Sequence, residues 1–502
     1  MAMTSRRNIG IVAHIDAGKT TLTEQILHGT GVLRRPGAVE DGSTVSDWHR
    51  QEQERGITIG SAAVVCGWQG VELTLIDTPG HVDFSLEVSR ALTVLDGTVV
   101  IFSGPDGVQA QTQTVWHQVA DHELPAIGFV NKLDRPGYDD QALVDEIRER
   151  LGVEALPLQV PLTFGGHTLA LLDVLTGEKW TWELVHKKAG VRPPTVSTDL
   201  DDHEELLRLL ALDRIADAVA SCSDAFAERF LAGDDLSRAD CIARSGVGPA
   251  QLLDAVIGLL PAPEQAPAPR VFEVTTGAAS GRHDSTSPAA FVFKTERRRG
   301  DRRLAHIRVF SGTLRQGDRF RALPDGPTVI PSQLVRMMGI DEIPVEALHA
   351  GTVGALVYAS DAPQLCTGQT LTVGTGLSVT FESVRVPTPV IAVSVEAANI
   401  EEDGRMRQLL AQLVHDDPSL TVLHDRDTGQ TLLAGMGELH LELALERLSQ
   451  DEGLDCRVGH PRPRLRHMIA RSARVTAGAA RDDSPRGSVE LTLSLSASER
   501  ME

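Results

Sequence analysis

Residues 8–21, NIGIVAHIDAGKTT, constrain the fold more than any other part of this sequence. The apolar run IGIVA predicts a short buried strand, and a tight loop ending in Gly-Lys-Thr joins it to a segment with helical spacing. Such a strand, loop and helix start form a cradle for phosphate, because backbone N–H groups and the helix N-terminus face the anion. We expect Lys19 to reach the β- and γ-phosphates of a nucleotide and the Thr20 hydroxyl to bind Mg²⁺.

This first motif has an alternative explanation when it is taken alone. Ala13 stands where such loops usually have their first glycine, and Gly-Lys-Thr can occur by chance at the start of a helix. The choice between the two interpretations depends on motifs further along the chain.

Length and composition indicate several domains. A chain of 502 residues should hold about three or four domains, and 41 % hydrophobic residues can fill several cores. The N-terminus lacks the apolar region of a secretory signal, and no run approaches the ~18 apolar residues that span a membrane. The five cysteines are scattered without a CxxC pair, which argues against a disulfide framework or a zinc site and favours a reducing cytoplasm.

The formal net charge of −21 argues against a protein that coats nucleic acid through bulk electrostatics. Two local basic clusters remain candidates for contact with RNA. They are Arg297, Arg298 and Arg299 with Arg302 and Arg303, and Arg462 with Arg464 and Arg466. Each cluster is equally compatible with a solvated loop.

Residues 1–268 alternate apolar strands with helical stretches, as in a doubly wound α/β domain. Strands are expected at 9–14, 62–68, 71–76, 98–102 and 126–130. Three further motifs occur in this part of the chain: RGITI at 55–59, DTPGH at 77–81 and NKLD at 131–134. The last two follow strands directly, and ligands of such sheets bind beyond the carboxyl ends of the strands.

The residue types in these motifs suit a guanine nucleotide. Asp77 is placed to hold Mg²⁺ through water, and Gly80 can turn its N–H toward a γ-phosphate. The Asp134 carboxylate can accept hydrogen bonds from N1–H and the exocyclic amine of guanine, which adenine does not supply. A site built on such paired bonds discriminates strongly, because the wrong base leaves a buried acceptor unpaired. Four motifs in this order favour a nucleotide site over unrelated turns.

The motifs AHIDAGKTT, QEQERGITI, DTPGHVDF and NKLDR resemble those of the translational GTPases, most closely elongation factor G. The resemblance implies that Thr20 and Thr58 bind Mg²⁺ beside Asp77, and that Asn131 and Asp134 select guanine. The residues expected to bind GTP or GDP are Ala13, His14, Ile15, Asp16, Ala17, Gly18, Lys19, Thr20, Thr21, Asp77, Thr78, Pro79, Gly80, His81, Asn131, Lys132, Leu133 and Asp134.

The resemblance also implies a catalytic set of His81, Lys19 and Thr58. His81 would orient the attacking water or stabilise charge near it, in a phosphoryl transfer that depends on positioning and charge stabilisation. Ile15 and Ile57 would form an apolar gate that keeps His81 away until the ribosome repositions it.

One segment departs from the family pattern. The family has a strand followed by a Ser-Ala pair that helps to hold guanine, whereas the sequence from Leu236 to Arg244 lacks a clear strand and has Ile242-Ala243 at that place. An acidic, leucine-rich helix expected at 201–231 resembles part of the family's inserted subdomain, although an ordinary amphipathic helix would look the same. Losing one hydrogen bond to the base would cost ~0.5–1.5 kcal/mol and weaken nucleotide affinity.

The rest of the chain predicts smaller domains of other classes. A proline-rich linker at 261–269 precedes a β-barrel over 270–384, which resembles the second domain of the same GTPases. Residues 388–460 follow the order of a ferredoxin-like fold, a split βαβ arrangement, and resemble domain III of elongation factor G. Residues 461–502 would begin a truncated fourth domain, in which 489–495 reads as one amphipathic strand with no partner of its own.

These observations favour a monomeric, cytoplasmic, ribosome-associated GTPase of the elongation factor G group, with ribosomal RNA and proteins as partners and no membrane. It would hydrolyse GTP to drive translocation or ribosome release. Two alternatives stay open: a ribosomal protection or release-factor-like GTPase, and a nucleotide-dependent binding protein that does not hydrolyse GTP.

Overall fold

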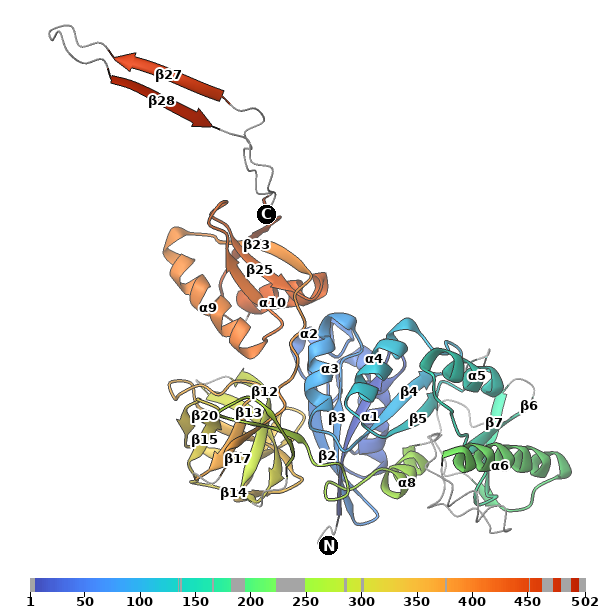
Figure 1. Cartoon of the computed structure of the whole chain (residues 1–502). Coiled ribbons are helices and arrows are strands. Elements are labelled where there is room, and N and C mark those ends of the chain that lie inside the picture. Colours follow the sequence, from blue (N-terminus) through green and yellow to red (C-terminus); the bar gives the residue numbers. More distant parts are fainter. Residues whose placement is uncertain are drawn as a thin grey trace.

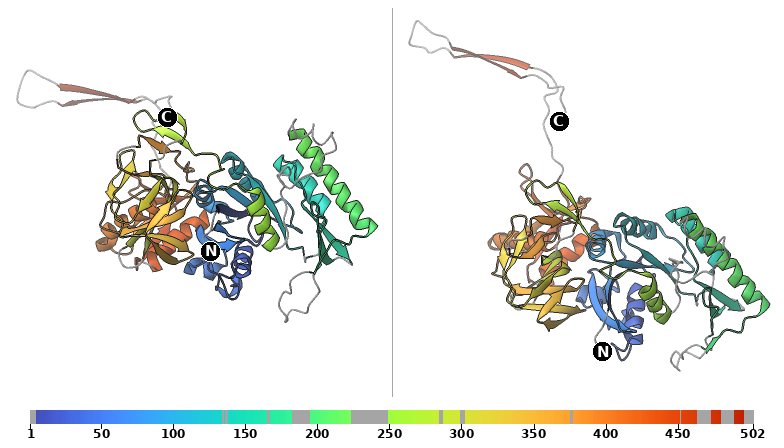
Figure 2. Two further views of the ribbon diagram at one scale, coloured as in Figure 1. Left: turned by 90° about the horizontal axis from the view of Figure 1, so that it is seen from below. Right: turned by 60° about the horizontal axis from the view of Figure 1, so that its bottom comes forward.

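The computed structural model describes residues 5–133, 135, 138–164, 167–181, 195–222, 249–283, 287–298, 302–374, 377–450, 452–462, 473–479 and 489–495. The first domain lies at the centre, between a β-rich second domain on one side and its own inserted subdomain on the other (Figures 1 and 2). A third domain lies above the first two in Figure 1. The fold class expected from the sequence is confirmed.

The first domain is built on a five-stranded sheet in the order β2-β3-β1-β4-β5. The strands are β1 Ser5–Ala13, β2 Ala62–Trp68, β3 Val71–Asp77, β4 Gly97–Ser103 and β5 Ala126–Asn131. All neighbours run parallel except β2, which is antiparallel to β3. Every residue of β3 and β4 is buried, as expected for parallel strands that are covered on both faces.

Helices cover both faces of this sheet. They are α1 Lys19–Gly29, α3 Ser85–Leu92, α4 Ala110–Asp121, α5 Asp140–Leu151 and α8 Pro249–Leu259, while the short α2 Arg50–Arg55 contacts the third domain. Apolar residues of α1 and α8 share one core with the sheet, and those of α3, α4 and α5 share another. The carboxyl ends of β1, β3 and β5 are thereby held at one rigid edge.

The inserted subdomain is a second, smaller sheet with the long helix α6 Asp202–Cys222 packed on it. Its strands are β6 Gln159–Phe164, β7 His167–Asp173, β8 Lys179–Thr181 and β9 Thr195–Ser197, in sequential order. Leu172 and Ile215 are fully buried between the sheet and α6. The expected helix at 201–231 is described as far as Cys222, and the altered segment from Leu236 to Arg244 lies outside the described residues.

The second domain is an eight-stranded antiparallel sheet in the order β16-β15-β21-β12-β13-β20-β17-β18, curled around one apolar core. Its strands are β12 Ala289–Arg298, β13 Arg302–Ser311, β15 Phe320–Leu323, β16 Thr328–Val329, β17 Gln333–Met338, β18 Asp341–Val345, β20 Val353–Ala359 and β21 Thr370–Val373. Flanking ladders join β14 Thr313–Arg315 with β19 Ala347–His349, and β10 Arg270–Glu273 with β11 Ala279–Arg282 and β22 Val379–Phe381.

The third domain has the split βαβ order that the sequence predicts. Its strands β23 Ile391–Ala397, β24 Thr421–His424, β25 Thr431–Gly435 and β26 Cys456–Gly459 lie in the order β24-β25-β23-β26. The helices α9 Asp403–Asp416 and α10 Glu438–Gln450 pack on this sheet through one core. The short 3-10 helix η3 Ile400–Glu402 precedes α9.

The last strand, β28 Val489–Leu495, is paired along its whole length. It runs antiparallel to β27 Ala473–Ala479, with Ala473 opposite Leu495 and Ala479 opposite Val489. The prediction of a strand without a partner was therefore wrong, because the mixed composition of 473–479 gave no clear strand pattern. No helix among the described residues is both long and apolar enough to cross a membrane.

Candidate active site

The loop after β1 has the backbone geometry of a phosphate cradle. Asp16 and Gly18 have positive φ angles of 61° and 97°, and α1 begins at the next residue, Lys19. A Cβ on Gly18 would lie 2.4 Å from Nδ2 of Asn131, so glycine is required for space as well as for its φ angle. Asp16 is not a glycine, and such sparsely populated backbone conformations cluster at functional sites.

Lys19 is buried inside this loop. Its Nζ donates to the carbonyl oxygens of Ala13, at 3.3 Å, and His14, at 2.9 Å. Burial lowers the pKa of Lys19, while the charges of Asp77 and Asp16 act in the opposite direction. A Cβ on Gly80 would lie 2.4 Å from this Nζ, so the segment after β3 lies directly against the lysine.

The predicted metal ligands come together beside Lys19. Oγ1 of Thr20 lies 3.1 Å from Oγ1 of Thr58, and the Thr58 hydroxyl donates to Oδ1 of Asp47 at 2.8 Å. Asp77 is fully buried, and neither of its carboxylate oxygens forms a hydrogen bond of good geometry with the described residues, although the Ser46 hydroxyl lies near enough to lower its pKa. Burial raises the pKa of Asp77 to about 8, the charge of Asp47 adds to the shift, and Lys19 opposes it.

These oxygen donors fit Mg²⁺, which binds through few carboxylates together with hydroxyls and water. An orphaned buried carboxylate is costly unless a cation or a donor meets it. No group of three or more His, Cys, Asp or Glu side chains in the described part of the chain could hold a metal ion by itself. The candidate site instead combines Asp77 with the hydroxyls of Thr20 and Thr58.

His81 lies at the start of the 3-10 helix η2 Val82–Phe84. Its Nδ1 accepts a hydrogen bond from the backbone N–H of Asp83 at 3.2 Å and lies 3.4 Å from Oδ1 of the same residue. The side chain is 29 % exposed. Thr78, three residues earlier, is tied to β1 by a 2.8 Å hydrogen bond from its hydroxyl to the carbonyl oxygen of Ile11.

The structure describes residues 131–133 of the base-recognition motif NKLD. Nδ2 of Asn131 donates to the carbonyl oxygen of Ala17 at 2.8 Å, which joins this motif to the phosphate loop. Lys132 has a positive φ of 61°, and its Nζ lies 3.6 Å from Oδ2 of Asp106. Asp134 lies outside the described residues, so its role in selecting guanine stays a prediction.

Glu52 fixes the position of Thr58, and the sequence reasoning missed it. Its side chain accepts hydrogen bonds from the backbone N–H groups of His49, Ile59 and Gly60, each at 3.0 Å. Burial raises the pKa of Glu52 to about 7. The spacing of His49 and Glu52 is that of a capping box at the start of α2, which was the available sequence signal.

Three other supporting residues were missed. Asp47 binds the Thr58 hydroxyl, Gln111 accepts from the N–H of Ile15 at 3.1 Å, and the Asp83 carboxylate faces His81. Their partners are distant in sequence or lie in turns without a fixed motif. Ile57 packs beside a small apolar cluster that includes Phe84, and the expected contact of Ile57 with Ile15 stays a prediction.

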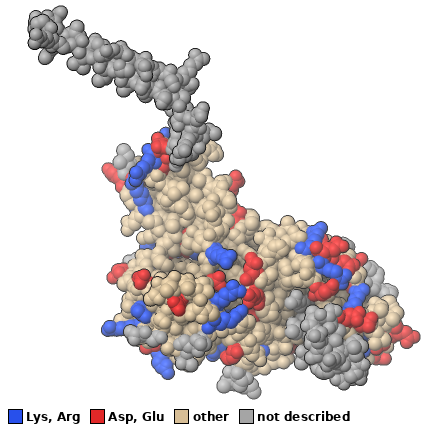
Figure 3. Space-filling model, viewed as in Figure 1, with Lys and Arg blue, Asp and Glu red and all other residues tan. Residues whose placement is uncertain are grey.

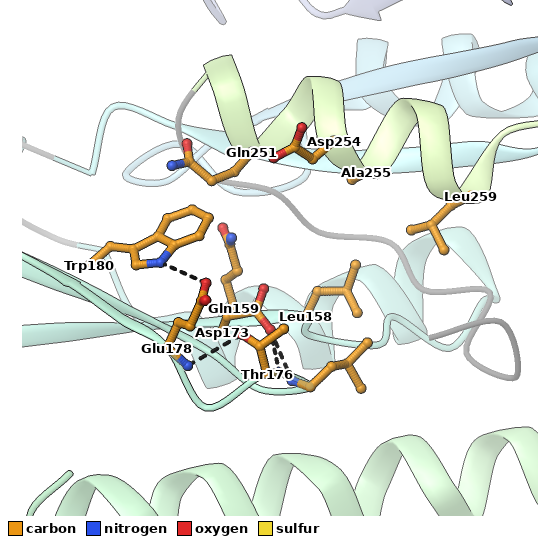
Figure 4. A pocket seen from close by; sticks show the side chains of 11 residues that line it. Leu158, Gln159, Asp173, Thr176, Glu178, Trp180, Gln251, Asp254, Ala255 and Leu259 are labelled. Atoms are coloured by element: carbon orange, nitrogen blue, oxygen red, sulfur yellow. Dashed lines mark hydrogen bonds between the residues drawn. The ribbon is translucent and has the colours of Figure 1, made fainter. Parts of the chain in front are cut away.

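A cavity of about 90 Å³ lies elsewhere, between the inserted subdomain and α8 (Figure 4). Asp173, Glu178 and Trp180 line one wall, and Gln251 and Asp254 project from α8 on the other. Its lining contains none of the predicted nucleotide-binding residues. Glu178 accepts a hydrogen bond from Nε1 of Trp180 at 3.2 Å within it.

Four arginines of the first basic cluster form ion pairs within the protein, and the fifth, Arg299, lies outside the described residues. Arg297 pairs with Glu452, Arg298 with Glu296, Arg302 with Glu342 and Arg303 with Asp416. The Arg298 guanidinium also lies 4.3 Å from the ring centroid of Trp48 in the first domain. On the face drawn in Figure 3, acidic and basic side chains are intermingled. The interpretation as an RNA-binding patch therefore loses support, while Arg464 and Arg466 of the second cluster lie outside the described residues.

Comparison with protein families gives three matches in order along the chain. The elongation factor Tu GTP binding domain matches residues 4–262, elongation factor G domain 2 matches 287–374, and elongation factor G domain III matches 386–460. The first match covers the cradle and both segments that meet at the candidate metal site.

Curated relatives and a solved structure agree with these matches. "Elongation factor G 2" of Syntrophus aciditrophicus (strain SB) is 35 % identical over 484 residues, which cover 92 % of this chain and 70 % of that protein. "Elongation factor G 2" of Treponema pallidum (strain Nichols) is 35 % identical over 506 residues, covering 95 % and 72 %. A crystal structure of a Thermus thermophilus protein superposes with a TM-score of 0.80 at 26 % identity, over 98 % of this chain and 72 % of that one.

Proposed function

This chain belongs to the elongation factor G family of translational GTPases and hydrolyses GTP, and we propose that the cluster around Lys19 is where it does so. Lys19 and the loop amides would hold the β- and γ-phosphates, and Asn131 and Asp134 would select guanine. The domains would divide as the sequence predicts, at 1–268, 270–384, 388–460 and 461–502. The observation that carries the proposal is the buried Asp77 carboxylate near the charges of Lys19 and Asp47, of which Asp47 accepts from the Thr58 hydroxyl that pairs with Thr20.

The described residues support specific roles in the reaction. Thr20, Thr58 and Asp77 would hold Mg²⁺, which neutralises charge that develops on the phosphates. His81 would orient a water for attack on the γ-phosphate. Its Nδ1 accepts from the backbone of Asp83, which leaves Nε2 as the atom that faces the water. Glu52 and Asp47 would hold Thr58 in place from behind.

We propose the ribosome as the partner and the cytoplasm as the location, with the chain acting as a monomer in translocation or ribosome release. The relatives that support this are named as elongation factors.

The test is GTP turnover with and without ribosomes, for the wild type and His81→Ala. Ribosomes should stimulate GTP hydrolysis by the wild type. His81→Ala should lower kcat by about 10²- to 10⁴-fold, because a positioned general acid or base contributes a factor of this size. The affinity of this variant for GTP should stay unchanged. ATP should not compete with GTP. Absence of ribosome stimulation would refute the proposed partner, and wild-type turnover by His81→Ala would refute the assigned role of His81.

A further inference from the structure

The third domain touches the segment that carries His81 at one small, buried contact. The backbone N–H of His440, in the first turn of α10, lies 3.4 Å from Oδ2 of Asp83 and donates to it. A Cβ added to Gly437, directly before α10, would lie 2.2 Å from Oδ2 and Cγ of Asp83 and 2.3 Å from Oδ1. The carboxylate of the first domain therefore sits against the N-terminus of α10, where its negative charge is favoured.

Gly437 is needed here for space. It is not among the described residues with a positive φ angle, so alanine would fit its backbone conformation without strain. The nearest obstacle to a larger residue is the Asp83 carboxylate, since all three atoms nearest to the added Cβ belong to it. A methyl group at 437 would force this carboxylate to move.

The same carboxylate faces the proposed catalytic histidine. Oδ1 of Asp83 lies 3.4 Å from Nδ1 of His81, and the Asp83 N–H donates to that nitrogen at 3.2 Å. Because Nδ1 accepts from the Asp83 N–H, this backbone N–H is the group that holds the ring. The carboxylate of the same residue lies beside the ring with one oxygen and accepts from α10 with the other, so α10 anchors the residue whose N–H binds His81. A shift of α10 relative to the first domain would therefore move Asp83, and this movement would change the orientation of the His81 ring.

On the third-domain side of this contact, hydrogen bonds hold the His440 side chain in place. Nε2 of His440 lies 2.9 Å from Oδ2 of Asp417, and its Nδ1 accepts from the N–H of Met436 at 3.2 Å. Burial would raise the pKa of Asp417, but His440 and Arg90 hold it well below its usual range. Phe84 lies between the two histidines, with ring centroids 5.8 Å from His81 and 6.0 Å from His440.

We propose that Asp83 is a positioning residue for GTP hydrolysis. It keeps the His81 ring in its catalytic orientation only while Gly437 and the first turn of α10 pack against it. Asp83 does not touch the nucleotide in this proposal. It transmits the placement of the third domain to His81. The proposal rests on the role assigned to His81 above.

The test compares Asp83→Ala with Gly437→Ala, which change the same contact from opposite domains. Each should lower kcat for GTP hydrolysis by about 10- to 100-fold, the size expected when a catalytic group is misplaced by about 1 Å. KM and the affinity for a fluorescent GTP analogue should stay within twofold of the wild type, because no interaction with bound nucleotide is lost. The double variant should be no slower than the slower single variant, because both changes release the same carboxylate.

A matched control is Gly404→Ala in α9. It adds the same methyl group to a helix of the same domain, and no atom lies within 4 Å of the new Cβ. This variant should keep wild-type kcat. Asp83→Asn, which retains the size of the side chain and an accepting oxygen, should recover part of the activity lost in Asp83→Ala.

The outcomes separate this inference from the assignment of His81. If His81→Ala lowers kcat while Gly437→Ala and Asp83→Ala turn over GTP as the wild type does, the positioning role is refuted and the assignment of His81 stands. If the effects of the two variants multiply in the double variant, or if both weaken nucleotide affinity as much as kcat, the shared contact is also refuted. If His81→Ala has no effect, the assignment of His81 itself is refuted.

Discussion

Replacing Asp96 with alanine should loosen the joint between the first and second domains. Asp96 lies immediately before β4 and is almost fully buried, and its carboxylate pairs with the guanidinium of Arg308 from β13. The other oxygen accepts from Nδ2 of Asn8 at 2.7 Å, and this same amide donates to the carbonyl oxygen of Gly351 at 2.9 Å. Arg308 also donates to the carbonyl oxygen of Val94 at 2.7 Å.

The expected cost is large because both charges are buried. The side chains of Arg308 and Asp96 are 5 % and 0 % exposed, and removing one partner of such a pair leaves the other charge uncompensated, which costs about 3–5 kcal/mol. For a domain of about 150–250 residues each kcal/mol lowers Tm by about 2–4 °C, so the drop should be about 6–20 °C. Glu154→Ala breaks an ion pair with Arg148 in which both side chains are about half exposed, and solvent screening should make its cost much smaller.

Differential scanning calorimetry of both variants beside the wild type is the assay, since a chain of several domains need not unfold in one transition. The double variant Asp96→Leu with Arg308→Met should recover most of the loss, because an apolar pair of similar volume often replaces a buried ion pair without cost. A drop in Tm for Asp96→Ala no larger than that for Glu154→Ala would refute the reasoning. Failure of the double variant to recover stability would show that the hydrogen bonds of Asn8 and Val94 matter more than the charge pair.

Two further predictions concern pH and metal. Burial would raise the pKa of Glu87, but Lys294 and Arg90 hold it at about 2, below the usual 4.5. Glu87 therefore adds stability that is present above about pH 4.5 and is lost as the pH falls toward 2. Urea titrations at several pH values should show that the free energy of unfolding of Glu87→Gln falls less steeply over this range. Chelation of Mg²⁺ should speed release of a fluorescent GDP analogue, and Asp77→Asn should make the release rate less dependent on Mg²⁺. An equal dependence in wild type and variant would exclude Asp77 from the metal site.

The part of the site that could be predicted from sequence is the part fixed by short segments. Lys19 and Thr20 directly follow a loop whose residue types define its backbone, and Asp77 is the last residue of β3, so their chemistry can be inferred from a few neighbours. The strands themselves were predictable because parallel strands buried on both faces read as continuous apolar runs. Both inferences use information within about ten residues, the length over which local patterns act.

The rest of the site depends on contacts between distant segments. Asp83 is one acidic residue in a turn, and what distinguishes it is a contact with His440, which is 357 positions away. Asp47 acts through its bond to the Thr58 hydroxyl, and no spacing rule connects the two. The sequence left the first basic cluster open between contact with RNA and a solvated loop for the same reason, because the carboxylates that neutralise Arg297 and Arg303 belong to the third domain.

Helix α10 contacts α2, which precedes Thr58 in the chain, and also the segment that carries His81. These contacts differ in how much they stabilise the docking of the third domain. Near its middle, Gln51 of α2 donates to the carbonyl oxygen of Leu443 at 3.2 Å, and Arg55 pairs with Glu442, whose side chain is 63 % exposed. An ion pair that is open to solvent contributes little, about 0–1 kcal/mol. At its N-terminus the Asp83 carboxylate is held in a space that only glycine leaves open. A rotation of the third domain would move all these contacts together, because they lie on one rigid helix, and the buried contact with Asp83 is the one whose loss reaches His81.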